Sequence, residues 1–547
     1  MTKVKLIYAP AWERLHPLPP LGIATLTAAL RKDGIYVEQV DLELLCWMDN
    51  WKAESAQRLD LKLLTDYSKV KKHILQEPDS DLQREISKCF NLTEFGGFDL
   101  LGFSVMGYRQ FVSSLCLANE VKKRTKSKVV FGGSFVSNRA RSILERFSLV
   151  DFVLGGDAWA SLPNLCSELG EHRVVTEKLH DVQGLTYRSS NEVRTTPPMG
   201  NPIKSMPCPD YDYLPLYLYR DQLNIVYKHE FDMLILQYLV GTGCARRCSF
   251  CGRPRLAKLE MVPLEKIVAD LKSLSKKYGT RYFCIECNEI NPTCSWAKNF
   301  SRALISNHVD IEWYAYAVPA NLDRDTLDQM FNAGCRMLRF GVESGSPKIV
   351  RSMRKGFTVD ECQRVLKNSH DAGMWNHVNF ILGYPGENEH DIDETRDFFL
   401  RNAENIDSVR INPYILHKDS VIYENPNKYG IKIIEEDLDQ AIFDEIGGLS
   451  WEQKRQLTLR GIHELVRAFK SKDAQFGISY NLLFCSMVHF QGRGEARRWM
   501  KQNHKYLFES LPFQAVRWKI YHRNEEPPFP LDWNYFVGKA LGYYAKV

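Results

Sequence analysis

Three closely spaced cysteines could bind a metal centre: Cys244, Cys248 and Cys251, in the segment GTGCARRCSFCGRP. Their spacing is C-x3-C-x2-C, whereas a zinc ribbon has two C-x2-C pairs that complete a tetrahedral site. Three thiolates on one loop can instead hold three irons of a cubane cluster and leave the fourth iron open for chemistry. Glycines on both sides let the backbone wrap closely around such a group. The loop therefore predicts a catalytic iron–sulfur centre, with a structural zinc knuckle as the alternative.

Most of the other cysteines stand alone, and we interpret them as small core residues. Cys284 and Cys287 form another C-x2-C, but they bracket the end of a predicted strand, where alternate residues face opposite sides. They are therefore not expected to complete a zinc site. Arg246 and Arg247, between the cysteines of the loop, either meet a carboxylate or are solvated.

The elements around the cysteine loop form a regular strand–helix series. A predicted strand over residues 234–240 leads into the loop. Further strands are expected over residues 281–285, 311–315, 337–342, 378–382 and 408–413, with helices such as 263–277 and 358–372 between them. Six such units indicate a partial parallel barrel like a TIM barrel, in which loops at the carboxyl ends of the strands form the site.

Residues 1–195 show a similar alternation. Strands are expected over residues 4–9, 36–40, 99–104, 128–131 and 151–154, with helices over 19–34 and 111–124 and a charged, helical insertion over about 44–95. Short apolar strands that alternate with helices indicate a Rossmann-like, doubly wound parallel sheet. Ligands of such sheets bind beyond the carboxyl ends of the strands.

Two further segments complete the expected organisation. Residues 196–232 are rich in proline and tyrosine and are interpreted as an extended connector to the barrel at residues 233–432. Residues 433–547 are predicted to form a mostly helical, aromatic-rich C-terminal cap. Its aromatic residues, which continue through the tail from Phe513, belong either to a helical core or to a substrate pocket.

Composition limits the class of protein. The chain has 547 residues, 44% of them hydrophobic and 25% charged, as in globular proteins. Its net charge of +5 comes from 72 basic and 67 acidic side chains, so no dedicated nucleic-acid surface is expected. No run of about 18 apolar residues occurs, and the N-terminal MTKVKLIYAP alternates like a strand rather than an export signal. We therefore expect a soluble, cytoplasmic protein without a membrane span.

The cysteine spacing, with an aromatic residue before the third cysteine, resembles the signature of the radical S-adenosylmethionine (SAM) superfamily. The segments FGVESGSPKIVRSMRKGFT (340–358) and FILGYPGE (380–387) resemble the fourth-strand and fifth-strand segments of that family. The resemblance implies a [4Fe–4S] cluster on the three cysteines. Its open iron chelates SAM, which one electron then cleaves. The implied SAM contacts are Phe250, Glu286, Glu343, Gly383 and Pro385.

Residues 1–195 resemble the N-terminal domain of the cobalamin-binding branch of the family, in the segments PPLGIATLTAALRKDGIYVEQVD, DLLGFSVMG and VVFGGSFVS. In that branch the cobalamin lies between the sheet and the barrel. The implied cobalamin contacts are Asp41, Ser104, Val105, Gly132, Gly133, Gly155 and Gly156. The chain has no D-x-H-x-x-G motif, so no imidazole is expected below the cobalt. It also has VLGGDAWAS where the family more often has Gly-Glu-Gly-Glu, which leaves a front domain without cobalamin as an alternative.

The resemblance implies a cobalamin-dependent radical SAM methyltransferase with a carbon of a small-molecule or peptide substrate as acceptor. One SAM would methylate cobalamin, and a second would supply the 5′-deoxyadenosyl radical that activates the substrate for methyl transfer from methylcobalamin. An external one-electron reductant of the flavodoxin or ferredoxin type is implied as partner. No individual catalytic residue is assigned. Alternatives within the family are a polar route, cyclisation, oxidation or rearrangement, and ordinary radical SAM chemistry.

Two other classes of function are considered. Transfer-RNA methylthiolation needs a second cluster, for which Cys46, Cys89 and Cys116 are available, but their surroundings lack the glycine and polar context of cluster loops. A non-catalytic sensor with a structural cluster would leave the family-like segments at several strand ends unexplained. Both classes are therefore disfavoured against the methyltransferase.

Overall fold

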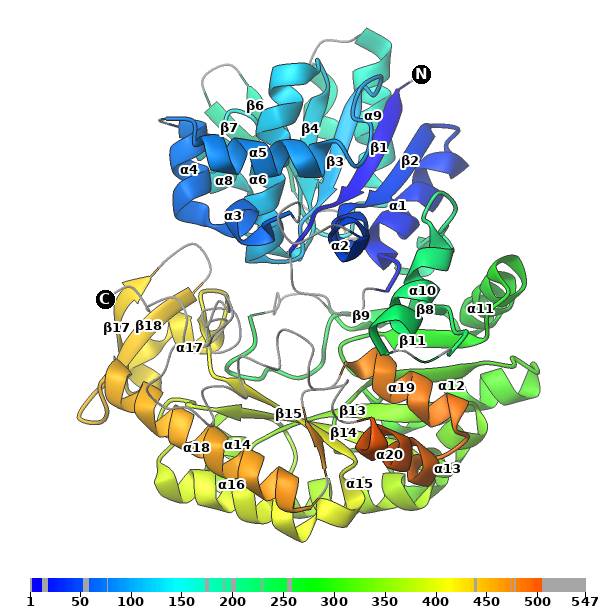
Figure 1. Cartoon of the computed structure of the whole chain (residues 1–547), viewed down its shortest axis with the longest axis vertical. Helices are drawn as coiled ribbons and strands as arrows, with labels where there is room; N and C mark the ends of the chain where they lie inside the picture. Colours follow the sequence, from blue (N-terminus) through cyan, green and yellow to red (C-terminus); the bar gives the residue numbers. More distant parts are fainter. Residues whose placement is uncertain are drawn as a thin grey trace. The chain divides into compact units, whose positions relative to one another are not determined.

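The computed structural model (Figure 1) describes residues 2–11, 18–52, 59–75, 77–172, 177–189, 192–197, 203–227, 229, 231–252, 258–436, 440–472, 474–476 and 479–503. The chain divides into two compact units, Met1–Val226 and Tyr227–Val547. Within the described residues, none of the helices is both long and apolar enough to span a membrane. The aromatic tail from Phe513 lies outside the described residues.

The first unit is built on a seven-stranded sheet with the order β2-β1-β3-β4-β5-β6-β7. Its parallel strands are β1 (Lys3–Tyr8), β2 (Tyr36–Asp41), β3 (Leu100–Ser104), β4 (Lys128–Gly132) and β5 (Phe152–Leu154). Two antiparallel strands, β6 (Leu185–Ser189) and β7 (Glu192–Thr195), extend the edge. Because the connections from β1 run to both sides, ligands are expected at the carboxyl edge near β1 and β3. The Rossmann-like prediction is confirmed.

Helices surround this sheet. The helices between the strands are α1 (Leu21–Lys32), α6 (Tyr108–Arg124), α7 (Ser134–Ser137), α8 (Ala140–Arg146) and α9 (Ser161–His172). The predicted insertion between β2 and β3 is helical, with α2 (Leu42–Lys52), α3 (Leu61–Thr65), α4 (Tyr67–Leu75) and α5 (Ser80–Phe90). Asp60 and Asp79 accept N-cap hydrogen bonds at α3 and α5, which explains where these short helices begin.

The connector is not extended throughout, and in this respect the sequence prediction is wrong. It contains a short 3-10 turn, Ile203–Ser205, and the twelve-residue helix α10, Leu216–Tyr227. The last proline of the connector, Pro215, directly precedes α10, where a missing backbone N–H does not interrupt helical hydrogen bonds. The prolines therefore mark the approach to a helix.

The second unit contains a seven-stranded parallel sheet with the order β19-β15-β14-β13-β12-β11-β8. Its strands are β8 (Ile235–Leu239), β11 (Tyr282–Glu286), β12 (Glu312–Ala317), β13 (Cys335–Glu343), β14 (Trp375–Leu382), β15 (Ser408–Pro413) and β19 (Gln475–Phe476). The helices that alternate with them are α11 (Leu264–Tyr278), α12 (Cys294–Ser306), α13 (Arg324–Asn332), α14 (Pro347–Ser352), α15 (Val359–Asp371) and α16 (Glu389–Arg401). The two edge strands, β8 and β19, are not paired with each other, so the partial-barrel prediction is confirmed.

The C-terminal region is mostly helical, as expected, but it begins with strands that the sequence analysis did not predict. The strands β17 (Ile431–Glu436) and β18 (Gln440–Glu445) pair antiparallel, and β18 also pairs with β16 (Leu416–His417), which follows β15 in the chain. The helices α18 (Trp451–Ser471), α19 (Tyr480–His489) and α20 (Arg493–Gln502) come next. A register shift between Ile433 and Glu435 breaks the strand alternation of IKIIEE, which hides it in the sequence.

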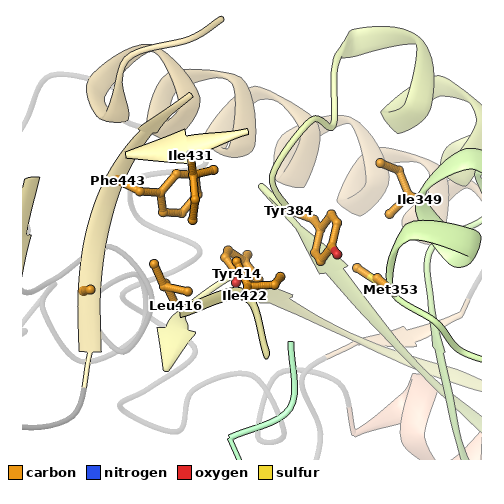
Figure 2. Packing of buried hydrophobic residues seen from close by; sticks show 9 residues of the cluster. Ile349, Met353, Tyr384, Tyr414, Leu416, Ile422, Ile431 and Phe443 are labelled. Atoms are coloured by element: carbon orange, nitrogen blue, oxygen red, sulfur yellow. The ribbon is translucent and has the colours of Figure 1, made fainter. Parts of the chain in front are cut away.

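A hydrophobic cluster links this small sheet to the loops at the carboxyl end of the barrel (Figure 2). The ring of Tyr414 lies 5.4 Å from that of Tyr384 and 5.9 Å from that of Phe443, measured between centroids. Ile349 and Met353 extend the cluster toward the fourth-strand segment, and Phe250 of the cysteine loop packs against it. This core therefore supports the loop that carries the cysteines.

Candidate functional site

The cysteine loop lies between two short strands at the carboxyl end of β8. These strands, β9 (Gly241–Thr242) and β10 (Glu260–Met261), pair antiparallel. Ser249, which is fully buried, fixes the loop: its N–H donates to the Met353 carbonyl at 3.0 Å, and its hydroxyl lies 2.8 Å from the Tyr384 hydroxyl. The three cysteines are partly exposed. The loop thus presents three thiols from an anchored backbone.

A buried ion pair holds the loop from its other side. Arg246 Nε donates to Glu289 Oε2 at 2.7 Å, and its Nη1 donates to the Lys355 carbonyl at 2.9 Å. Glu289 Oε1 also accepts from the Cys244 thiol at 3.4 Å, while the Arg246 N–H donates to the same sulfur at 3.3 Å. Arg246 therefore meets a carboxylate, one of its two expected roles, whereas Arg247 is exposed.

Two of the loop thiols, those of Cys244 and Cys248, have pKa values raised above the ordinary range of cysteine. Burial, followed by the nearby Glu289 charge, raises the pKa of Cys244 to about 11. Burial also raises the pKa of Cys248, although Lys355 acts in the opposite direction. Because a metal binds the thiolate, loading a cluster on this loop must release protons.

Two charged residues from the fourth-strand segment lie beside the loop. Lys355 Nζ is 3.2 Å from Glu343 Oε1, and both side chains are largely buried. The backbone of Glu343 has a φ of +70°. A Cβ at Gly341 would lie only 2.6 Å from the carboxylate of Glu343, so this position requires glycine to accommodate the Glu343 side chain. Lys355 Nζ also lies 5.7 Å from the centroid of the Phe250 ring. The structure thus brings together Phe250, Glu343 and the ammonium of Lys355.

The fifth-strand segment forms a tight loop after β14. Gly383 has a φ of +89°, and a Cβ there would lie 2.5 Å from Thr458 Oγ1 of α18. Its N–H donates to Glu387 Oε2 at 2.5 Å, and burial raises the pKa of Glu387 to about 7. Gly383 and Pro385 are both buried. Their predicted contact with SAM stays a prediction.

Glu286 ends β11 and accepts a hydrogen bond from the Cys284 thiol at 3.1 Å. Next to it, the interior of the barrel carries polar residues that the sequence analysis missed, namely Arg339, His377 and Tyr480. A signal was available, because Arg339 and His377 are polar residues in the middle of central strands whose residues are mostly buried. Buried polar residues in central strands indicate a functional interior.

The predicted cobalamin contacts gather at the carboxyl edge of the first sheet. Gly133 has a φ of +115°, and a Cβ there would lie 2.4 Å from the Val105 carbonyl oxygen, so the turn requires glycine. The Val105 N–H donates to the Gly132 carbonyl at 2.7 Å. Ser104 ends β3 at this edge, and Met106, two residues later, is 52% exposed. The contacts of these residues with cobalamin stay predictions.

The remaining predicted contacts at this edge also have partners within the unit. Gly155 donates its N–H to the Gly184 carbonyl at 2.8 Å, and Gly156 donates to Ser137 Oγ at 3.3 Å. Asp41 is buried, with Oδ1 accepting from the Leu44 N–H at 3.0 Å and Oδ2 from the Tyr219 hydroxyl at 2.8 Å. These contacts give Asp41 a structural role at the start of α2, and its contact with cobalamin stays a prediction.

The three upstream cysteines lie in helices and are fully buried. Cys46 and Cys89 come from α2 and α5, with their sulfurs 3.5 Å apart. Cys116, on α6, donates to the Leu64 carbonyl at 3.7 Å. Helical positions without exposed surface do not offer the open side that a catalytic cluster needs.

Comparisons with known proteins agree with this site. The family description "Radical SAM superfamily" matches residues 238–399. An uncharacterized methyltransferase from Pyrococcus horikoshii is 24% identical over 274 residues, 49% of this chain and 57% of that protein. The ribosomal protein uS12 methylthiotransferase RimO from Cytophaga hutchinsonii is 28% identical over 29% of this chain and 39% of its own length. The chain therefore spans about half, or less, of these curated relatives.

Two solved structures resemble nearly the whole chain. The radical SAM methyltransferase TsrM from Kitasatospora setae, with cobalamin and a [4Fe–4S] cluster bound, has a TM-score of 0.63 at 16% identity and covers 92% of this chain and 100% of its own. The cobalamin-dependent radical SAM enzyme OxsB, with aqua-cobalamin and SAM bound, has a TM-score of 0.61 at 14% identity and covers 96% of this chain and 74% of its own.

The described chain has a Rossmann-like unit and a second unit with an open parallel barrel, in which a three-cysteine loop follows the first strand. Residues 238–399 match the radical SAM superfamily, and the fold of the chain resembles the folds of TsrM and OxsB.

Proposed function

We propose that the chain is a cobalamin-dependent radical SAM methyltransferase that transfers a methyl group from SAM, through cobalamin, to a carbon of its substrate. The observation that carries this proposal is the anchored loop of Cys244, Cys248 and Cys251 beside the Glu343–Lys355 pair. The match to a radical SAM domain and the whole-chain likeness to TsrM and OxsB support it.

The residues of the loop fit a [4Fe–4S] cluster. Three thiols on a loop with partly exposed sulfurs and a backbone N–H donor to one of them form a donor set that suits iron and sulfide.

The residues around the loop would position SAM. We propose that Glu286 and Glu343 accept hydrogen bonds from its amino group or ribose, and that Phe250 lies against its adenine, with Gly383 and Pro385 as the adenine wall. When bound, the cluster supplies the electron that cleaves SAM, and cobalamin carries the methyl group. Burial of the Glu343–Lys355 pair keeps water away from this side of the site.

The carboxyl edge of the first sheet would hold the cobalamin. Ser104, Gly132 and Gly133 lie at the ends of adjacent strands there, and we propose that the corrin packs over them and over Met106. Cobalamin binding by TsrM and OxsB, which share the fold, supports this proposal. We expect a small-molecule substrate, since one structure of TsrM holds tryptophan as substrate, and an external one-electron reductant.

Methylthiolation is a weaker proposal for this chain. RimO is a relative over 29% of the chain, but the upstream thiols are enclosed in helices. A second cluster would need the helical insertion to unfold around them.

The test of the proposed function is anaerobic reconstitution with iron, sulfide and hydroxocobalamin, followed by iron and corrin analysis. We expect about four irons and one cobalamin per chain. Cys248→Ala should lose the iron and keep the cobalamin, whereas the matched control Cys208→Ala, outside the loop, should keep both. Zinc in place of iron, reproduced anaerobically, would overturn the proposal, and iron without cobalamin would reduce it to ordinary radical SAM chemistry.

A further inference from the structure

Arg339 is a buried cation without a carboxylate partner in the interior of the barrel. It lies in the middle of β13 and is only 5% exposed. Within the described part of the chain, none of its nitrogens has a carboxylate oxygen within 4.0 Å, and its Nε has no hydrogen-bond acceptor. Glu286 attracts it only from a greater distance. A buried charge without a partner is costly, so it calls for a ligand of opposite charge.

Aromatic rings, rather than carboxylates, surround the guanidinium of Arg339 in the described residues. The Tyr316 ring lies 3.5 Å from the guanidinium carbon, measured to the centroid, and the rings of Tyr314 and Tyr480 lie at 4.9 and 5.0 Å. All three rings lie within the distance of a cation–π contact. Along the edge of the guanidinium, the one hydrogen bond in the described residues is a long contact of Nη2 to Cys284 Sγ at 3.9 Å.

The neighbouring side chains do not neutralise this charge. His377 packs against Tyr480, with 4.8 Å between ring centroids, and its pKa falls to about 3 because it is buried near Arg410 and Arg339. It is therefore neutral at pH 7, and its Nε2 also has no hydrogen-bond partner in the described residues. Arg410 adds a second guanidinium, 5.9 Å from the Tyr480 ring centroid. In the described residues, Arg339 Nε and His377 Nε2 are thus neighbouring buried polar atoms that have no hydrogen-bond partner.

Three other partly buried arginines have carboxylate or carbonyl partners within the described residues. Arg246 is paired with Glu289 at 2.7 Å, and Arg497 with Asp407 at 2.7 Å. Arg188 donates to three backbone carbonyls at 2.6 to 2.7 Å. A partner within the chain is therefore the rule here, and its absence at Arg339 points to a ligand.

We propose that Arg339 binds the carboxylate of the substrate, so that the substrate is a carboxylic acid. This inference rests on the proposed function, because it assigns the substrate class of the same barrel. A carboxylate matches the planar N–H edge of a guanidinium better than other common anionic groups of its size do. Tyr480, from α19 of the C-terminal region, completes the subsite, which gives that region a part in substrate selection.

The test uses benzoate as the probe and benzamide as its uncharged match, with the melting temperature of the reconstituted enzyme as the readout. We expect millimolar benzoate to raise the melting temperature of the wild type by about 2 °C or more, and benzamide to leave it unchanged. Arg339→Met should abolish the benzoate effect. Arg336→Met is the matched control, because Arg336 lies on the same strand as Arg339 but is paired with Glu312. This variant should retain the benzoate effect.

A benzoate effect that survives in Arg339→Met, or is absent from the wild type, would overturn the inference. Two molecules of the proposed reaction carry a carboxylate, the substrate and SAM. The affinity of the enzyme for SAM, measured by equilibrium dialysis, distinguishes between them. We expect Arg339→Met to bind SAM within about threefold of the wild type. A loss of about tenfold or more would assign Arg339 to the carboxylate of SAM and overturn the substrate assignment. Failure of the proposed function would appear separately, as a wild type that does not bind a cluster.

Discussion

At the scale of single residues, the cysteine motif is only part of the site. Ser249 and Arg246, which lie between the cysteines, hold the loop through Met353, Tyr384 and Glu289. The spacing of the cysteines singles out this loop as the candidate cluster site, because three thiols in eight residues have few other uses. It could not predict Glu289, whose side chain comes from a different loop and reaches Arg246 only through the fold.

The Arg246–Glu289 pair gives the first prediction. Glu289→Ala leaves a buried guanidinium without its partner, which costs about 3 kcal/mol in comparable sites. We therefore expect the variant to lose iron to a chelator roughly tenfold faster than the wild type, measured by absorbance. Glu312→Ala breaks a similar pair, with Arg336 at 2.9 Å, away from the loop and should not change the rate. Equal rates for the two variants would contradict this account of the loop.

Gly383 gives a second prediction at the same scale. Gly383→Ala adds a Cβ at a φ of +89° and 2.5 Å from Thr458 Oγ1, so both backbone strain and a steric clash oppose it. We expect a loss of about 2 kcal/mol or more in the free energy of unfolding, measured with urea. Gly386→Ala is the control, because Gly386 has a similar φ of +78° but nothing within 4 Å of its Cβ position. If both variants lose the same free energy of unfolding, the steric clash with Thr458 does not contribute to the loss.

At the scale of elements, strands and helices were predictable where the apolar pattern is long. Strand β15 matches its predicted range, and β8, β11 and β12 differ from theirs only at the ends. The apolar pattern did not predict elements whose formation depends on tertiary contacts. Helix α10 follows a proline-rich stretch, and the β17–β18 hairpin has an irregular register. In both places the tertiary partners stabilise an element that the local sequence signals weakly.

The loop after β14 gives a prediction for pH dependence. Burial raises the pKa of Glu387 to about 7 from its ordinary 4.5, so between these values the folded state binds a proton that the unfolded state has lost. The free energy of unfolding must therefore fall as the pH rises from 4.5 to 7, by up to about 3 kcal/mol. Glu387→Gln removes the ionisation and should flatten this slope in urea unfolding at several pH values. An unchanged slope would show that Glu387 stays charged in the fold.

At the scale of the whole molecule, the likeness to solved structures and the likeness to sequence relatives differ in extent. TsrM resembles 92% of the chain in fold, whereas the methyltransferase from Pyrococcus horikoshii aligns with 49% of it. The shared fold explains the order of the two units and the place of the cysteine loop. It does not specify the substrate, which we propose is selected by side chains of the barrel interior such as Arg339 and Tyr480.

The central claim is that the chain moves a methyl group through cobalamin. Its most direct test needs no substrate: the reconstituted enzyme is reduced with flavodoxin, supplied with SAM that carries a CD3 group, and its corrin is extracted in the dark for mass spectrometry. We expect CD3-labelled corrin together with an equal amount of S-adenosylhomocysteine, because each transfer of a methyl group from SAM to cobalamin produces one of each. Corrin without label, while SAM is cleaved only to 5′-deoxyadenosine and methionine, would contradict it.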